Sequence, residues 1–323
     1  MSVEEQATKI LRMAVEQRLT DLYFLPVGQQ YQIKKRTSTG IELWQMMTRT
    51  EVKPLLNHLK YSAKMSLSET RRPQLGARTL KMADRTVFLR LSTVGNFENL
   101  ESMVIRFIYA YADTNQFIFP QQLTQLQQLS QQRGLMLFAG PTGSGKTTTL
   151  YRIARQNAQE KIVMAIEDPI EIYENNFLQL QVNDQANMTY AELLKVSLRH
   201  RPDIFIIGEI RDEQTAAAAI RAALSGHLVL STVHARSAAG VIKRLTDFKI
   251  DQETLKDCLT SVCYQRILPT EKKQAAILFD LLNNQTLAGA FTGKTMVGWP
   301  KLLEQAWQDG IISSETAKAY QNG

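Results

Sequence analysis

The sequence predicts an α/β protein in which a parallel-sheet domain follows a smaller α+β domain and precedes a mostly helical tail. Four short, nearly continuous apolar runs lie between residues 135 and 232, separated by polar or alanine-rich helical stretches. A glycine-rich loop joins the first run to a helical stretch, and strand-like patterns fill much of residues 1–112. Continuous apolar runs are typical of strands buried on both faces of a parallel sheet.

The N-terminal domain, residues 1–112, begins as a capped helix. Ser2 and Glu5 have the spacing of a capping box, which marks a helix start. Apolar side chains then recur on one helical face, at Ile10, Leu11 and Ala14. Strands are predicted at residues 21–27, 31–36, 85–94 and 102–110.

A linker is expected at residues 113–122, where polar residues and a proline break the pattern. The glutamine-rich stretch 121–132 follows, and it favours a surface helix over disorder. Glutamine is a fair helix former, and leucines recur at helical spacing at Leu123, Leu126 and Leu129.

The parallel-sheet domain is expected to span residues 123–265. Residues 266–323 are expected to form a C-terminal extension that is mostly helical and carries no chemical motif. The four apolar runs that predict the strands are "LMLFAG" (135–140), "KIVMAI" (161–166), "DIFIIG" (203–208) and "HLVLST" (227–232).

Composition is that of an ordinary folded protein, with 44% apolar and 21% charged residues in 323. No apolar run approaches the roughly 18–20 residues of a membrane span, and no basic-then-apolar signal opens the chain. The charge of +7 comes from small basic groups without interleaved aromatics, so direct nucleic-acid binding is not expected. Cys258 and Cys263 are expected to be reduced thiols of a cytoplasmic protein, and the four histidines are not spaced as a zinc site.

The strongest motif is "GPTGSGKT", residues 140–147, which fits the phosphate-loop pattern between a strand and a helix. Its glycines let backbone N–H groups wrap phosphates, and the helix N-terminus adds its positive dipole end. Lys146 would reach the β- and γ-phosphates of ATP, and the Thr147 hydroxyl would ligate Mg²⁺. The candidate nucleotide-binding residues are Gly140, Pro141, Thr142, Gly143, Ser144, Gly145, Lys146, Thr147 and Thr148.

Two further predicted strands end in carboxylates, Glu167 and Glu209. Because ligands collect at the carboxyl ends of parallel strands, both should lie on the edge that carries the phosphate loop. One carboxylate would activate the attacking water and the other would support Mg²⁺. The sequence leaves open which residue has which role, and Glu209 is the candidate metal ligand. Either could instead only cap the following helix.

His234 lies at the end of a fourth strand, where it could sense the γ-phosphate or be a surface residue. Arg90 and Arg106 lie in N-terminal strands, and an isolated arginine in a strand is most often only solvated.

Taken together, the motifs resemble those of the secretion ATPases of type II secretion, type IV pili and competence systems. Beside the phosphate loop, "AIEDPIE" (165–171) looks like that family's aspartate box and "LRHRPDIFIIGEIRD" (198–212) like its Walker B region. "AIRAALSGHLVLSTVHARSAAG" (219–240) looks like its histidine box. The resemblance covers most of residues 1–265 and implies a RecA-like P-loop core behind a PAS-like N-terminal domain.

The N-terminal domain carries part of the resemblance. "ILRMAVEQRLTDLYFLP" is similar to the family's opening helix and strand, although Tyr23 replaces the usual histidine. "RLSTV" and "MVIRF" match segments whose arginines reach a nucleotide at domain or subunit boundaries. The resemblance therefore implies that role for Arg90 and Arg106, and more weakly for Arg85.

The histidine box looks more like that of assembly motors than of retraction motors, while a four-cysteine zinc element and an additional N-terminal domain are missing. With the short length, this resembles the competence ATPases of Gram-positive bacteria. The resemblance implies a homo-hexameric, Mg-dependent ATPase without zinc, held at the inner face of the membrane by a polytopic platform protein and driving pseudopilus assembly for DNA uptake. A DNA-translocating or conjugation-type ATPase and a non-catalytic nucleotide-binding scaffold are the alternatives.

Overall fold

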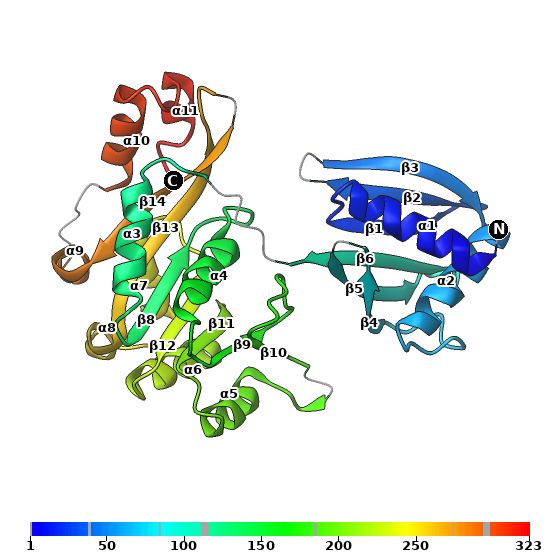
Figure 1. The fold of residues 1–323 in the computed structure, drawn as a ribbon, viewed down its shortest axis with the longest axis horizontal. Helices are drawn as coiled ribbons and strands as arrows, with labels where there is room; N and C mark the ends of the chain where they lie inside the picture. The colour runs from blue at the N-terminus through cyan, green and yellow to red at the C-terminus, as the bar shows by residue number, and fades with distance from the viewer. Residues whose placement is uncertain are drawn as a thin grey trace. The chain divides into compact units, whose positions relative to one another are not determined.

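The computed structural model describes residues 2–37, 40–83, 85–110, 116–183, 186–272, 274–292 and 298–323. The chain forms two compact units, Met1–Ala110 and Tyr111–Gly323. Each unit contains its own sheet, and Figure 1 shows the elements of both units.

The N-terminal unit is a six-stranded antiparallel sheet with two helices. The strand order is β3-β2-β1-β6-β5-β4, and each neighbouring pair runs antiparallel. The predicted strands are confirmed, and two further strands form its edges. The elements are α1 (Val3–Glu16), β1 (Asp21–Val27), β2 (Gln30–Thr37), β3 (Gly40–Thr48), α2 (Arg49–Ser62), β4 (Gln74–Lys81), β5 (Thr86–Gly95) and β6 (Glu101–Tyr109).

The core of this unit lies between the helices and the sheet. Ser2 and Glu5 form the predicted capping box at the start of α1, and Thr48 and Glu51 form a second one at the start of α2. The apolar faces of both helices pack against alternating residues of the central strands. The confirmed α1 face includes Ile10, Leu11 and Ala14.

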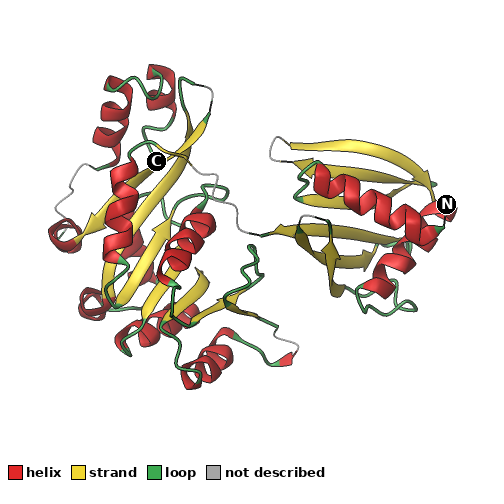
Figure 2. Cartoon of the chain, in the orientation of Figure 1, coloured by secondary structure: helices red, strands yellow, loops and turns green. Residues whose placement is uncertain are grey.

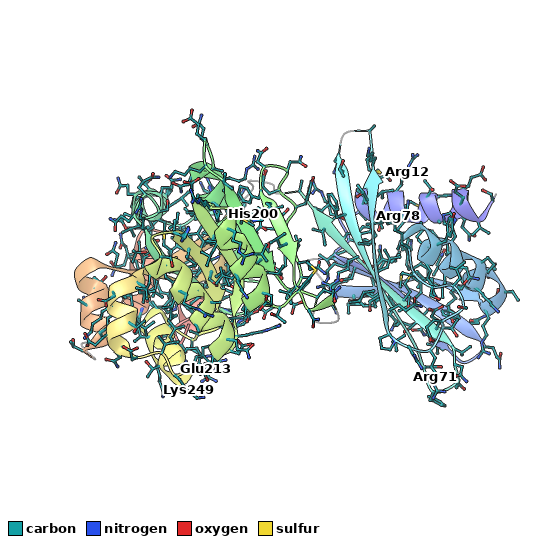
Figure 3. The ribbon with its side chains drawn as sticks, turned by 90° about the horizontal axis from the view of Figure 1, so that it is seen from below. Arg12, Arg71, Arg78, His200, Glu213 and Lys249 are labelled. Atoms are coloured by element: carbon teal, nitrogen blue, oxygen red, sulfur yellow. The ribbon has the colours of Figure 1, made fainter. Side chains whose placement is uncertain are left out.

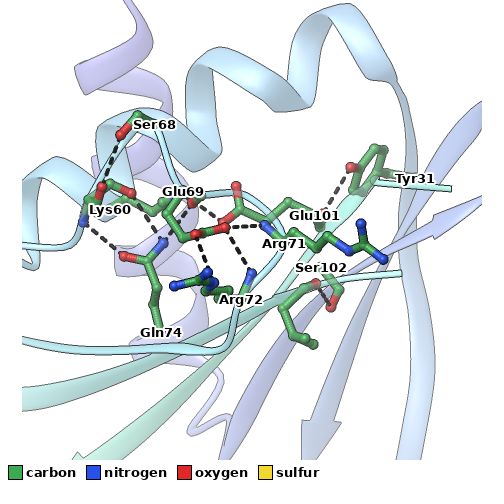
Figure 4. Close-up of polar contacts among 11 residues, drawn as sticks. Tyr31, Lys60, Ser68, Glu69, Arg71, Arg72, Gln74, Glu101 and Ser102 are labelled. Carbon is green, nitrogen blue, oxygen red and sulfur yellow. Dashed lines mark hydrogen bonds and ion pairs between the residues drawn. The ribbon is translucent and has the colours of Figure 1, made fainter. Parts of the chain in front are cut away.

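A buried ion pair ties α2 to the first residue of β6 (Figure 4). The Nζ atom of Lys60 lies 2.7 Å from Oε1 of Glu101 and also donates to the backbone carbonyl of Glu69 at 2.7 Å. The Tyr31 hydroxyl donates to the Glu101 carbonyl at 2.9 Å. The Lys60 side chain is fully buried, so its charge is compensated inside the unit.

The C-terminal unit is built on an eight-stranded sheet of order β10-β9-β11-β12-β8-β13-β14-β7. Strands β10 to β13 in this order are parallel, and β14 runs antiparallel to β13. The four strands predicted from apolar runs are confirmed as β8, β9, β11 and β12. The strands are β7 (Gln116–Phe117), β8 (Gly134–Ala139), β9 (Val163–Glu167), β10 (Leu178–Gln181), β11 (Ile204–Ile210), β12 (Leu228–Val233), β13 (Leu259–Pro269) and β14 (Ala275–Asn283).

Helices cover both faces of this sheet (Figure 2). Residues of β8 alternate between two cores, with Leu135 and Leu137 packed in one and Met136 and Phe138 in the other. This burial on both faces explains the continuous apolar runs. The helices are α3 (Pro120–Leu129), α4 (Lys146–Asn157), α5 (Tyr190–Arg199), α6 (Glu213–Leu224), α7 (Ala238–Asp247), α8 (Gln252–Cys258), α9 (Asn284–Phe291), α10 (Trp299–Gln308) and α11 (Ser314–Ala319).

The glutamine-rich stretch forms the predicted helix α3. Its three leucines face the core, and its glutamines lie mostly toward solvent. Part of the predicted linker, residues 113–115, lies outside the described residues. The rest contributes β7, which pairs with β14, and the start of α3.

The tail is not mostly helical, because residues 266–283 contain the end of β13 and all of β14. The boundary expected at residue 265 therefore falls inside β13, which pairs with β8 on one side and with β14 on the other. Pairing along nine positions overrides the helix-forming Ala and Leu of β14. Helices α9, α10 and α11 follow these strands.

Both cysteines of the C-terminal unit are free and buried. Burial raises the pKa of Cys258 to about 11, and it raises the pKa of the Cys263 thiol as well. Among the described residues, no helix combines the length and apolar character needed to cross a bilayer.

Exposed charged side chains are labelled on both units in Figure 3. In the C-terminal unit Lys249, just after α7, lies beside Glu213 in the first turn of α6, with Nζ and Oε2 2.7 Å apart. Arg12 and Arg71 are exposed side chains of the N-terminal unit in the same view. Such exposed charges contribute little to stability individually.

Candidate nucleotide-binding site

The phosphate loop leaves β8 and enters α4, as its motif predicts. Gly143 and Gly145 have φ values of +80° and +82°, which favour glycine. At Gly140 a side chain is also excluded sterically, because a Cβ atom would overlap the carbonyl oxygen of Gln265. The loop is therefore held in one tight course by its glycines.

Strand β13 packs against the loop and hydrogen-bonds to it. The buried Gln265 donates from Nε2 to the carbonyl oxygen of Ser144 at 2.6 Å. Sequence reasoning missed this residue, because nothing in the sequence places a strand from beyond residue 258 beside the loop. The geometry shows that Gln265 fixes the second half of the loop against the sheet.

Lys146 points back into the loop. Its Nζ donates to the carbonyl oxygens of Gly140 at 3.0 Å and Pro141 at 2.9 Å. Burial lowers the pKa of the Lys146 ammonium, while the carboxylates of Glu209 and Glu171 act to raise it. An ammonium group at this place in the loop can donate charge-assisted hydrogen bonds to an anion such as a phosphate.

Glu209 and His234 meet at the carboxyl ends of β11 and β12. Nε2 of His234 lies 3.4 Å from Oε1 of Glu209, and both side chains are roughly half exposed. The predicted gathering of strand-end residues therefore includes this pair. The pair joins the ends of two neighbouring strands of the sheet.

The two glutamates of the "AIEDPIE" segment have different environments. Glu167, at the end of β9, is only 3% exposed and accepts a hydrogen bond from the Tyr151 hydroxyl. Burial raises the pKa of Glu167 to about 7. Glu171 instead accepts a hydrogen bond from Oγ1 of Thr147 at 2.8 Å. The carboxylate of this segment that contacts the loop is thus Glu171, which sequence reasoning missed although it lies in the same motif.

A charged contact joins the ends of β9 and β11. The Arg211 guanidinium donates to Asp168 at 2.8 Å, and this hydrogen bond raises the pKa of Arg211. The contact keeps the segment after β9 next to the segment after β11. Both segments carry carboxylates of the candidate site.

The arginines expected to act on a nucleotide lie in the N-terminal unit. Arg90 of β5 and Arg106 of β6 are directly opposite each other in the antiparallel ladder. Nε of Arg106 lies 2.9 Å from the buried Asp21, while half of the Arg106 side chain stays exposed. Arg85 lies just before β5. Their approach to a nucleotide stays a prediction.

The sequence profile described as "Type II/IV secretion system protein" matches residues 1–297. "Competence protein ComGA" of Streptococcus pneumoniae is 42% identical over 98% of this chain and 97% of its own length. The Bacillus subtilis protein of the same name is 37% identical over 83% of this chain and 76% of its own length. "Type II secretion system protein E" of Klebsiella pneumoniae is 35% identical over 80% of this chain and 53% of its own length.

Solved structures with the same fold include the pilus retraction motor PilT with bound ADP. It superposes with a TM-score of 0.76 at 24% identity, covering 97% of this chain and 96% of that one. The ATPase DotB of Legionella pneumophila has a TM-score of 0.72 at 19% identity, covering 96% and 94%. At these identities the likeness concerns the fold alone.

Proposed function

The chain belongs to the type II/IV secretion system protein family, as its motifs predicted, and from that premise we propose that it is an ATPase motor. One observation carries the proposal. Lys146 and Thr147 of the phosphate loop lie with Glu171, Glu209 and His234 at the carboxyl edge of a parallel sheet. This arrangement places a phosphate-binding loop and carboxylates at one site, as ATP hydrolysis requires.

The loop would bind the triphosphate, with Lys146 at the β- and γ-phosphates. The hydroxyl of Thr147 and the carboxylate of Glu209 would hold Mg²⁺, because oxygen donors are the ligands that this ion prefers. When bound, Mg²⁺ neutralises charge that develops on the phosphates. Glu209 also influences Lys146 electrostatically, which supports placing it near the phosphates.

The second carboxylate at the loop would orient the attacking water. Glu171 fits this role better than Glu167, because Glu171 contacts the loop while Glu167 is enclosed and hydrogen-bonded to Tyr151. Glu167 would then influence the site indirectly, through its hydrogen bond with Tyr151. His234, paired with Glu209, would respond to the γ-phosphate.

The N-terminal unit would supply the arginines and the moving lobe. In this proposal it is a PAS-like domain, the C-terminal unit is a RecA-like domain, and Arg90 and Arg106 offset negative charge on an ATP held by this copy or by a neighbour. Arg106 has about half of its side chain exposed while it pairs with Asp21. Arginines in that role contribute roughly 10³- to 10⁵-fold in other phosphoryl-transfer systems.

The relatives support a proposal for the cellular role. A chain 42% identical to a competence protein over nearly its whole length would drive assembly of a pseudopilus used in DNA uptake. The motor would be a cytoplasmic homo-hexamer, bound at the inner face of the membrane by a polytopic platform protein. Hydrolysis would move the two units and so move that partner.

Replacing Lys146 by Ala tests the site directly. Because the variant lacks the charge that faces the phosphates, calorimetry should show no ATP-binding heat at concentrations that saturate the unchanged protein. Lys161→Ala, an exposed lysine beyond α4, should bind ATP normally. Unchanged affinity in Lys146→Ala would refute the assigned site.

Molecular mass tests the ring. Light scattering with a non-hydrolysable ATP analogue and Mg²⁺ should give about six chain masses, since each site is proposed to draw arginines from an adjoining lobe. A monomer both with and without the analogue would contradict the motor proposal while leaving nucleotide binding intact.

A further inference from the structure

A buried hydrogen-bond network joins helix α4 to the segment that carries Glu171. Tyr151 is fully buried five residues after Lys146. Its hydroxyl donates to Glu167 and accepts a hydrogen bond from Nε2 of Gln179 at 2.7 Å. The helix that begins at the phosphate loop is therefore linked to both β9 and β10.

Gln179 directs all of its hydrogen-bonding groups at this region. Besides the bond to Tyr151, Nε2 donates to the carbonyl oxygen of Ile172 at 2.7 Å. Its Oε1 accepts from the backbone N–H of Glu174 at 2.9 Å. An amide has two N–H donors and one carbonyl oxygen, so each group here has a partner. A partly buried network whose donors and acceptors are all satisfied favours one arrangement of the chain around it.

The same face of α4 makes two more contacts to this segment. Arg155, one turn after Tyr151, lies with Nε 3.2 Å from Oε2 of the buried Glu174. The rings of Tyr151 and Phe177 have centroids 5.8 Å apart. The helix thus holds residues 172–179 by a hydroxyl, an ion pair and a ring contact.

Glu171 lies in the sequence between residues that this network anchors. It is preceded by the anchored Glu167 and followed at once by the anchored Ile172. Its contact with Thr147 therefore depends on how firmly α4 and this segment are fixed to each other. We propose that Tyr151 and Gln179 are positioning residues, which hold Glu171 at the phosphate loop for the hydrolysis step; this rests on the proposed ATPase function.

The network does more than fill space. A phenylalanine would occupy nearly the same volume as Tyr151, so the hydroxyl is not needed for apolar packing. A buried hydroxyl is costly unless it is hydrogen-bonded, and this one has two partners. Tyr151→Phe therefore removes the link and leaves the packing in place.

Turnover measurements separate positioning from binding. In Tyr151→Phe we expect the Kd for a non-hydrolysable ATP analogue to stay within about threefold, while kcat falls about 10- to 100-fold, as small misplacements of catalytic groups can cause. Tyr31→Phe removes a buried tyrosine hydroxyl from the other unit and should keep kcat. Unchanged kcat in Tyr151→Phe, or an equal loss of kcat and affinity, would overturn the proposal.

A second substitution tests whether the two residues act as one link. Gln179→Met keeps the length of the side chain but removes both donors. Combined with Tyr151→Phe, it should lower kcat no further than the larger single change, because either one breaks the same connection. Losses that multiply would show two independent roles and contradict the inference.

Hydrogen exchange tests the link without any turnover. The backbone N–H groups of Glu174, Asn176 and Phe177 are hydrogen-bonded within this segment. They should exchange at least about tenfold faster in full-length Tyr151→Phe, while the amides of β12 should not change. Unchanged exchange would overturn the positioning role even if the ATPase proposal held. If the protein proved not to hydrolyse ATP, faster exchange would still support the link.

Discussion

The two units each bury a glutamate and compensate it differently. In the N-terminal unit the Glu101 carboxylate lies against the Lys60 ammonium, with Oε1 and Nζ 2.7 Å apart. In the C-terminal unit the Glu167 carboxyl accepts a hydrogen bond from the neutral hydroxyl of Tyr151. Burial raises the pKa of Glu167 to about 7. The first arrangement is a closed ion pair, whereas the second leaves a carboxyl group that changes charge near neutral pH.

The difference indicates that the Lys60–Glu101 pair has a structural role, whereas Glu167 is a candidate for a functional one. A compensated pair fixes α2 against the sheet and has no group left to react. A buried carboxyl held only by neutral donors costs stability when it ionises, and groups of this kind cluster at functional sites. Ionisation of the buried Glu167 therefore destabilises the C-terminal unit, whereas the ion pair of Glu101 spares the N-terminal unit this cost.

The largest expected effect comes from opening the ion pair. Lys60→Met leaves Glu101 buried without its partner, and we expect the N-terminal unit to lose about 3–5 kcal/mol of unfolding free energy. Hydrogen exchange of the full chain, measured on β5 and β6, reports this unit separately from the other.

The controls lie on the same helix and in the same pair. Lys53→Met changes an exposed lysine of α2 and should shift stability by less than about 0.5 kcal/mol. Adding Glu101→Gln to Lys60→Met should restore part of the loss. A Lys60→Met protein as stable as the unchanged chain would remove the contrast between the units.

A smaller effect is expected from Glu167, and it depends on pH. The folded state keeps the Glu167 proton up to a pKa of about 7, whereas the unfolded chain releases it near 4.5. Stability should therefore fall as pH rises between these values, by up to about 3 kcal/mol above pH 7. Glu167→Gln should match the unchanged chain near pH 4.5 and be more stable near pH 8.

Urea unfolding of both proteins across this pH range measures the difference. Asp280, whose pKa burial raises to about 6, adds a similar trend to both, so it cancels in the comparison. Parallel stability curves for the two proteins would mean that Glu167 does not titrate as its burial indicates.

Much of the fold could be predicted, because its signals are local. The apolar runs of the central strands predict burial on both faces, and the leucine spacing predicts α3. Strand β14 was missed because the Ala- and Leu-rich run "AAILFDLLN" fits a helix as well as a buried strand, and its pairing with β13 decides between them. The pairing of β13 with β8, a distant segment of the chain, leaves little trace in a single sequence.

The site was predicted less completely, for a related reason. The phosphate loop is recognisable because its glycines and Lys146 must follow one another in order. The motif contains both Glu167 and Glu171, and the sequence does not show which of the two contacts the loop. In the folded chain Glu167 is buried and Glu171 accepts a hydrogen bond from Thr147. Gln265 and Gln179 act through hydrogen bonds that only the folded chain brings together.

The burial of both native cysteines has a practical consequence. The thiolate is the form that reacts with maleimide dyes and with disulfides, and Cys258, with its pKa raised to about 11, holds very little of it at neutral pH. Cys263 is also buried, in strand β13, and burial raises the pKa of its thiol too. Single cysteines introduced on the surface of each unit could therefore carry a fluorophore pair in an otherwise native chain, and energy transfer between them would test whether the two units change their separation when a nucleotide binds.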